Sequence, residues 1–250
     1  PVNRSARLAV GQAMTFSLNS FPPGGIAVVI GSTGGIGSAF MDALDASGRF
    51  GAVIGLSRGS EPRLDLLDEA SIEAAAAYVK DQGSLRLVVD ATGILSDAEM
   101  SPEKALRQID PAQMARSYAI NAIGPALLLK HFGPAMARDG KSVFATLSAK
   151  VGSIGDNGLG GWISYRAAKA GLNQIVRTAS IELGRRAPEL VVLALHPGTV
   201  DTGLSKPFAK AGLEVQPPEA AAGRLCSVID TADASQTGGF FSYTGERLPW

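Results

Sequence analysis

The chain has few of the residues on which several classes of function depend. Its 250 residues include one cysteine, Cys226, and two histidines, His131 and His196. A single cysteine excludes an internal disulfide and a thiolate zinc cluster, and two histidines are too few for a histidine-rich metal site. Aromatic residues make up only 6% of the chain, whereas it contains 30 glycines. This composition favours close packing of helices on a sheet and no bound metal.

An excess of either charge is also absent, because 23 basic residues balance 23 acidic ones. Without a basic surplus, we expect no long-range attraction for nucleic acid or an anionic membrane. No apolar run approaches the roughly 20 residues that would span a bilayer. Hydrophobic residues nevertheless make up 46% of the chain, enough for a full core. These features predict a soluble, cytoplasmic protein.

The first 25 residues differ from the rest. They contain Arg4 and Arg7 but no acidic residue, which loosely resembles a transit peptide. Gly11 and a pair of prolines interrupt the segment, and the runs ARLAV and MTFSL around GQA can form a small hairpin. We favour a structural arm over residues 1–25, followed by one domain over residues 26–250.

From residue 26 onward, short apolar runs alternate with helical patterns. The runs rich in β-branched residues are typical of buried strands: 26–31, 52–56, 85–91, 141–148, 190–195 and 238–243. Helical spacing is found over 38–47, 68–82, 111–137, 163–183 and 217–230. Strands alternating with helices predict a doubly wound, Rossmann-type α/β domain, with a mainly parallel sheet that we expect to have seven strands.

A glycine-rich turn, IGSTGGIGSAF (residues 30–40), joins the first strand to the first helix. Gly31 permits a tight turn, Gly35 permits close approach of a pyrophosphate, and Gly37 permits close helix–strand packing. The N–H groups at the start of the helix favour phosphate. The spacing is G-x-x-x-G-x-G rather than G-x-G-x-x-G, and such glycines can serve only a tight connection. The strand–turn–helix context favours dinucleotide binding.

Farther along, ISYRAAKAGL places Tyr165 and Lys169 four residues apart, on one helical face. A free tyrosine has a pKa of about 10, too high for an efficient base near neutral pH. A neighbouring lysine cation is expected to lower that pKa. Alone, the pair is more typical of an ordinary helix with a lysine at its rim.

Together, the glycine turn and the Tyr165-x-x-x-Lys169 pair resemble the short-chain dehydrogenase/reductase family. Further motifs follow the family's order over residues 26–250: DATG (90–93), where the family usually has Asn-Asn-Ala-Gly, NAIG (121–124), LSAKVGS (147–153) and HPGTVDT (196–202). The chain looks closest to C-factor-like proteins and Sniffer-like carbonyl reductases. The resemblance implies an NAD(P)(H)-dependent oxidoreductase that interconverts a carbonyl compound and an alcohol.

The resemblance also implies a role for each catalytic residue. Tyr165 would be the acid/base, and Lys169 would bind the nicotinamide ribose. Ser148 would hold the substrate oxygen, and Asn121 would organise a proton relay to solvent. An intact set of these four residues favours an enzyme over a C-factor-like signalling protein in which catalysis is incidental. A nucleotide-sugar epimerase or dehydratase shares Tyr-x-x-x-Lys, but few residues follow Pro197 to form its substrate lobe.

The end of the second strand bears on the choice of cofactor. Ser57 and Arg58 stand where an acidic side chain would favour NAD, so we expect NADP(H), with NAD(H) left open and a plain surface arginine as the alternative. The cofactor contacts that the resemblance implies are Gly31, Ser32, Thr33, Gly35, Ile36, Gly37, Ser57, Arg58, Asp65, Leu66, Ala91, Thr92, Gly93, Tyr165, Lys169, Pro197, Gly198, Thr199, Val200 and Thr202.

Substrate and partner contacts are expected on less regular segments. The loop 151–161, Trp162 and the segment 203–215 are candidates for the substrate pocket wall, and the last could close as a lid. The resemblance implies a homodimer, or a tetramer, through the helix over 111–137 and the Tyr165 helix. His131, His196 and Cys226 are expected to be structural.

Overall fold

The computed structural model describes residues 16–203 and 215–250, whose centre is a parallel six-stranded sheet. The strands are β1 (Ile26–Ile30), β2 (Ala52–Leu56), β3 (Leu85–Asp90), β4 (Ser142–Leu147), β5 (Leu190–His196) and β8 (Gly239–Ser242). Their order is β2-β1-β3-β4-β5-β8, and every pairing is parallel. The predicted parallel α/β class is confirmed.

The expected seventh strand is wrong for the part of the chain that the structure describes. Only residues 57–68 separate β2 from helix α2 (Glu69–Gln82). A parallel strand needs a crossover of a dozen or more residues before it can return to the sheet. Because this segment is too short for a crossover and a strand, β2 forms the edge of the sheet.

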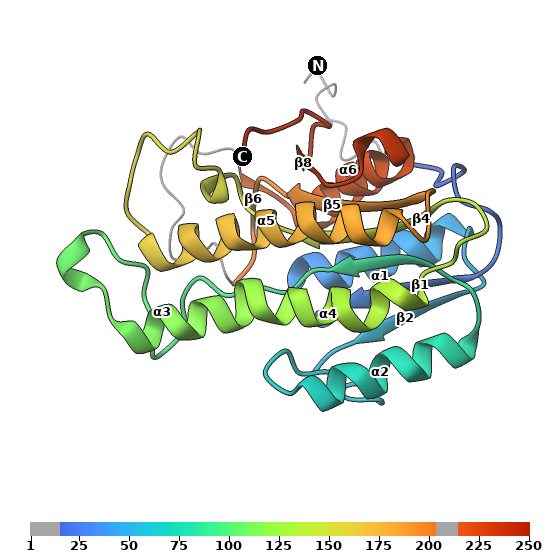
Figure 1. Cartoon of the computed structure of the whole chain (residues 1–250), viewed down its shortest axis with the longest axis horizontal. Helices are drawn as coiled ribbons and strands as arrows, with labels where there is room; N and C mark the ends of the chain where they lie inside the picture. The colour runs from blue at the N-terminus through green and yellow to red at the C-terminus, as the bar shows by residue number, and fades with distance from the viewer. Residues whose placement is uncertain (1–15, 204–214) are drawn as a thin grey trace, which may run out of the picture.

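Helices cover both faces of the sheet (Figure 1). Helices α2, α4 (Gly124–Phe132) and α5 (Ile163–Gly184) lie on one face, and α1 (Gly35–Ser47) and α6 (Pro218–Thr231) on the other. Alternate residues of β1 enter different cores, because successive side chains of a strand point to opposite faces. The chain changes direction across the sheet between β1 and β3, and ligands of open α/β sheets bind at such a switch point.

The long helix predicted over 111–137 is divided in the structure. Helix α3 (Pro111–Tyr118) begins as its sequence predicts, with the Asp110 carboxylate accepting a hydrogen bond from the Gln113 N–H at 2.8 Å. A π turn over Ala119–Ile123 then leads into α4, and a 3₁₀ turn over Gly133–Ala135 ends the run. Because π turns inside helices are frequent at functional sites, the one that carries Asn121 marks this position.

The segment before β1 is tied to the body of the protein. Leu18 and Phe21 are fully buried in the core shared with α1 and α6. Ser20 donates hydrogen bonds from its N–H and hydroxyl to the Asp230 carboxylate, at 3.0 and 2.6 Å. The predicted hairpin lies mostly outside the described residues.

Two short strands, β6 (Thr199–Val200) and β7 (Val215–Gln216), pair in parallel beside the main sheet. They flank the segment for which a lid was expected, and residues 204–214 of that segment lie outside the described residues. Among the helices that the structure describes, none combines the length and the apolarity needed to cross a membrane.

Candidate active site

The first turns of α5 present three buried polar side chains on one face. Tyr165, Lys169 and Asn173 follow one another at four-residue intervals, and they are 9%, 2% and 3% exposed. The Lys169 Nζ donates a hydrogen bond to the Leu147 carbonyl at 2.8 Å. It lies 5.9 Å from the centre of the Tyr165 ring. The helix therefore holds the proposed acid/base pair against the carboxyl end of β4.

Ser148 directly follows β4, and its N–H donates to the Leu195 carbonyl at 2.7 Å. Its hydroxyl donates to the Asn173 Oδ1 at 2.7 Å. The other polar atom of this carboxamide, Nδ2, is buried without a hydrogen-bond partner among the described residues. Ser148 is thus linked to the same helix that carries Tyr165 and Lys169.

Asn121 is fully buried, and its carboxamide pairs with both backbone groups of Ile94. The Oδ1 accepts from the Ile94 N–H at 3.0 Å, and the Nδ2 donates to the Ile94 carbonyl at 2.8 Å. A Cβ added to Gly93 would lie 3.3 Å from the Asn121 Oδ1 and 3.6 Å from the Lys169 Nζ. The structure therefore places Asn121 and Lys169 next to Gly93, three residues after the end of β3.

Burial determines the electrostatics of the site. Desolvation raises the pKa of the Tyr165 phenol, so the lowered pKa that the sequence predicted is wrong for this structure. The physical reason is that burial disfavours the charged phenolate. The Lys169 ammonium, which was expected to favour the phenolate, donates its hydrogen bond to the Leu147 carbonyl. Burial also lowers the pKa of Lys169 to about 8, and the charge of Asp90 opposes that shift.

Asp90 is a fully buried carboxylate where the family usually has asparagine. It accepts hydrogen bonds from the Thr146 hydroxyl at 2.6 Å and from the Thr92 hydroxyl and N–H at 2.5 and 3.0 Å. Burial raises the pKa of Asp90, although these three donors oppose the shift. The altered DATG motif therefore places an acidic side chain close enough to Lys169 for its charge to raise the lysine pKa.

The glycine turn between β1 and α1 has the shape of a phosphate cradle. Gly31 has φ +80°, and a Cβ on Gly37 would lie only 2.1 Å from the Gly31 carbonyl oxygen. A Cβ on Gly35 would lie 2.9 Å from the Thr202 methyl, so Thr202 borders the turn. The first N–H groups of α1 have no intrahelical partners and point along the positive end of its dipole. These residues fit the phosphates of a dinucleotide.

Comparisons with known proteins identify the family of the chain. A family model described as Enoyl-(Acyl carrier protein) reductase matches residues 43–236. The 1-hydroxy-2-glutathionyl-2-methyl-3-butene dehydrogenase of Rhodococcus sp. (strain AD45) is 32% identical over 191 residues, which cover 76% of this chain and 80% of that protein. The chain belongs to the short-chain dehydrogenase/reductase family.

Two further comparisons concern the kinds of protein that the sequence resembles. The C-signal protein of Myxococcus xanthus is 36% identical over 146 residues, covering 58% of this chain and 84% of that protein. The solved carbonyl reductase Sniffer of D. melanogaster shares the fold at 20% identity, with a TM-score of 0.78 and coverage of 90% of this chain and 99% of that one.

The remaining dinucleotide contacts predicted for this short-chain dehydrogenase/reductase lie on three other segments. Ser57 and Arg58 directly follow β2, and Ser57 is buried while Arg58 is exposed. Asp65 accepts from the Leu67 N–H at 3.0 Å, and Leu66 packs against Gly124. The third segment runs from Pro197 through Thr202 and includes Gly198, Thr199 and Val200; the Pro197 carbonyl accepts from the Gln216 Nε2 at 2.6 Å.

The rest of the turn adjoins DATG. A Cβ on Gly31 would lie 3.2 Å from both the Ala91 carbonyl oxygen and the Thr92 methyl. Ser32 and Ile36 are partly buried, whereas Thr33 is exposed. The structure thus brings together the glycine turn, DATG and Thr202, and it brings DATG to Asn121 and Lys169.

Sequence reasoning missed Glu103, a buried residue of the loop before α3. Its carboxylate accepts hydrogen bonds from the Ser164 N–H at 3.1 Å and from the Ser164 hydroxyl. Its carbonyl accepts from the Trp162 N–H at 2.5 Å. Trp162, the N-cap residue before α5, has φ +51°, a strained value for a bulky residue, and its ring lies edge-on to Tyr165 at 6.5 Å. Glu103 therefore fixes the start of the helix that carries Tyr165.

The residues expected to be structural, His131, His196 and Cys226, lie on α4, β5 and α6. The His131 Nε2 lies 3.0 Å from the Glu69 carboxylate, which links α4 to α2. Burial lowers the pKa of His196 to about 4 and raises that of the buried Cys226. No cluster of three metal-ligating acids, histidines or cysteines occurs over 16–203 and 215–250.

Proposed function

We propose that residues 26–250 form a single-domain enzyme that interconverts a carbonyl compound and an alcohol with NADP(H). The observation that carries this proposal is that α5 holds Tyr165 and Lys169 on one face and contacts Ser148 through Asn173. Lys169 also lies beside Gly93, at the sheet edge that holds the glycine turn. NADP(H), when bound, would supply or accept the hydride. The residues of the chain would position the substrate oxygen and move the proton.

Tyr165 is the proposed proton donor for carbonyl reduction. Because burial raises the pKa of its phenol, the hydroxyl keeps its proton at neutral pH and can give it to a developing alkoxide. Below about pH 8 the Lys169 side chain is an ammonium, which would stabilise the phenolate that remains. Asn121, held by Ile94 beside Lys169, would organise the relay through which solvent returns a proton.

The decisive experiment compares the protein with Tyr165→Phe. A panel of aldehydes, ketones and alcohols is assayed by the absorbance of NADPH, and NADPH binding is measured by fluorescence. We expect turnover to disappear in Tyr165→Phe while the dissociation constant for NADPH stays within about twofold. Full turnover in the variant would remove Tyr165 from the mechanism.

The preference for NADP(H) is proposed from the end of β2. No acid follows the strand directly, and the exposed Arg58 forms no ion pair with any described residue. The carbonyl reductase from chicken fatty liver, which shares the fold at 23% identity and a TM-score of 0.79 over 94% of this chain and 97% of that one, is described with NADPH bound. These observations support Arg58 as the partner of a 2′-phosphate.

Arg58→Ala tests that preference. A hydrogen bond to a charged group contributes about 1.5–3 kcal/mol, so NADPH affinity should fall roughly 10- to 100-fold while NADH affinity stays unchanged. Arg63→Ala is the matched control, because Arg63 already pairs with Asp65 and Asp68, at 2.5 and 3.5 Å. Equal affinity for both cofactors in the unaltered protein would contradict the assignment.

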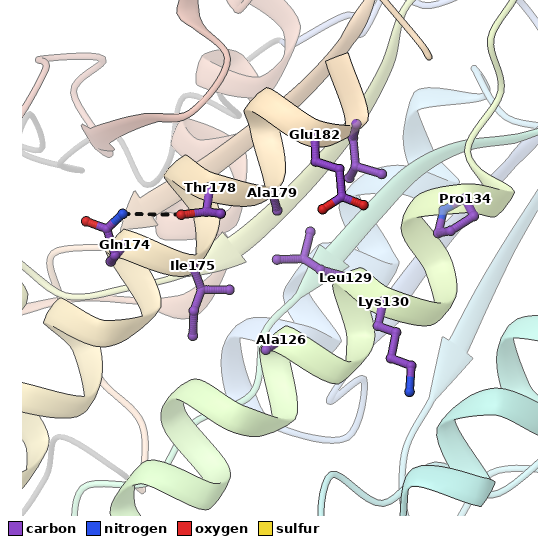
Figure 2. A pocket seen from close by; sticks show the side chains of 10 residues that line it. Ala126, Leu129, Lys130, Pro134, Gln174, Ile175, Thr178, Ala179 and Glu182 are labelled. Carbon is purple, nitrogen blue, oxygen red and sulfur yellow. Dashed lines mark hydrogen bonds between the residues drawn. The ribbon is translucent and has the colours of Figure 1, made fainter. Parts of the chain in front are cut away.

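A homodimer through α4 and α5 is part of the proposal. A groove of about 420 Å³ lies between these helices (Figure 2). Its floor is apolar and includes Leu129 and Ile175, and Glu182 stands at its rim, whereas the Lys130 side chain points away toward the Glu69 carboxylate. A second copy would cover this apolar floor in a two-fold contact.

The dimer is tested by sedimentation velocity. Ile175→Glu should shift the protein to a monomer, whereas Ile181→Glu, on the same helix but outside the groove, should leave the mass unchanged. A monomeric unaltered protein at micromolar concentration would remove this interface from the proposal.

A cytoplasmic location stays a prediction.

The similarity to the C-signal protein favours one alternative, a nucleotide-binding signalling protein. A binder needs the glycine cradle but no proton donor. If Tyr165→Phe abolished turnover yet left the biological activity of the protein intact, this alternative would replace the enzymatic role.

A further inference from the structure

Asn173 is a buried side chain whose polar groups are only half satisfied. Its Oδ1 accepts the Ser148 hydroxyl hydrogen at 2.7 Å, but its Nδ2 has no hydrogen-bond partner among the described residues. A buried donor without a partner destabilises a protein, and native structures contain few of them. An apolar side chain such as leucine would occupy a similar volume without this cost. The stability of the free protein therefore does not explain an asparagine here.

The position of Asn173 relative to the reacting groups suggests another explanation. It lies one helical turn after Lys169 and two turns after Tyr165, and it touches Ser148 directly. A serine hydroxyl has a single hydrogen to donate. In the structure, this hydrogen points to Asn173. While it does so, Ser148 can accept a hydrogen bond, but it cannot donate one to a substrate oxygen.

A half-turn of the Asn173 carboxamide would give the Nδ2 a hydrogen-bond partner and free the Ser148 hydrogen for the substrate. The oxygen and nitrogen of an amide are similar in size, so exchanging them hardly alters the packing. The Nδ2 then donates to the Ser148 Oγ, and the serine hydrogen is released toward the pocket. The atom left without a partner becomes a carbonyl oxygen, which proteins tolerate more readily than an orphaned N–H.

We propose that Asn173 is a positioning residue, which donates from Nδ2 to the Ser148 hydroxyl and so directs the serine hydrogen at the oxygen of the bound substrate. This inference rests on the proposed function, because it needs Ser148 to bind the substrate oxygen. In the free protein the amide takes the opposite orientation and accepts that hydrogen. No bond is made or broken at Asn173, and the reacting proton still comes from Tyr165.

Two variants separate the orientations. Asn173→Asp keeps the shape but, when ionised, can only accept, so it would fix the serine hydrogen away from the substrate. Asn173→Leu removes both polar atoms. We expect kcat for carbonyl reduction to fall at least tenfold in each, because a donor to the developing oxyanion is worth about 10²–10³ in kcat. NADPH affinity by fluorescence should change less than twofold, and each variant should melt as one cooperative transition.

The dependence on Ser148 is tested with Ser148→Ala and the double variant Ser148→Ala/Asn173→Leu. Because Asn173 acts only through the serine hydroxyl, the double variant should be no slower than Ser148→Ala, within twofold. Rates are compared at pH 6.5, because a new carboxylate one turn from Lys169 would raise the lysine pKa and shift the alkaline limb of the Asn173→Asp profile upward.

Three results would overturn the inference. The first is a full kcat in either single variant at Asn173. The second is a double variant whose loss in kcat equals the product of the two single losses, as a merely structural role would require. A weakened affinity for NADPH equal to the loss in kcat would show a general distortion of the site. By contrast, a Ser148→Ala protein with full kcat would locate the failure in the proposed function.

Discussion

Adding one methyl group to Gly37 tests the glycine turn. A Cβ there would lie 2.1 Å from the Gly31 carbonyl oxygen and 2.8 Å from the Gly31 carbonyl carbon. Side-chain carbons essentially never approach closer than 3.0 Å, so Gly31 must move by about 1 Å. Both clashing atoms belong to the backbone, which cannot rotate away as a side chain can. Gly37→Ala must therefore open the turn or displace the start of α1.

The cost follows from the hydrogen bonds that such a movement breaks. The Gly31 N–H donates to the Leu56 carbonyl at 2.8 Å, and the Gly31 carbonyl accepts from the Gly34 N–H at 3.0 Å. A protein hydrogen bond contributes about 0.5–1.5 kcal/mol net, so losing both destabilises the protein by about 1–3 kcal/mol. In a domain of this size, that corresponds to a Tm lower by about 2–12 °C. Displacing the α1 N-terminus should also weaken NADPH binding at least tenfold.

Calorimetry and fluorescence titration measure the two effects. Gly34→Ala is the matched control, because a Cβ at Gly34 would meet no atom closer than 3.4 Å. It should cost less than about 1 kcal/mol, the difference between glycine and alanine as an N-cap. The reasoning fails if Gly37→Ala retains the Tm and NADPH affinity of the unaltered protein.

Two further predictions concern pH and packing. The rate of carbonyl reduction should decline above about pH 8, where the Lys169 ammonium loses its proton. Asp90→Asn should move this alkaline decline of the pH–rate profile to lower pH, because it removes the charge that raises the Lys169 pKa. Rate profiles from pH 6 to 10 check both, and an unmoved limb in the variant would contradict the coupling. Phe132→Ala, at a fully buried site, should lower the free energy of unfolding by about 3–5 kcal/mol in urea titrations; a loss below 1 kcal/mol would contradict tight packing there.

The fold was largely predictable because its signals are local. Strands buried on both faces are continuous apolar runs, and those over residues 26–31 and 190–195 were located within a residue of β1 and β5. The missing seventh strand and the π turn depend on features that periodicity does not show. The strand is missing because the connection over 57–68 is short. The π turn arises because the helix contains one extra residue in the turn around Asn121.

The candidate site was only partly predictable, because its supporting contacts cross the chain. Glu103 reaches the first turn of α5 from 61 residues away, and no spacing rule connects it to Ser164. Asn173 did carry a local signal, since it continues the four-residue interval of Tyr165 and Lys169. That interval was visible in the sequence, but its meaning depended on the contact with Ser148.

The pKa of Tyr165 shows why spacing alone misleads about electrostatics. Four-residue spacing brings Lys169 near the phenol, but it does not reveal how much water either group loses. Burial acts in opposite directions on the two groups, raising the pKa of the neutral acid and lowering that of the cationic one. Between neutral pH and about pH 8, both side chains therefore keep their protons. In the reaction proposed above, Tyr165 would therefore begin with its proton in place, as a proton donor to a carbonyl oxygen requires.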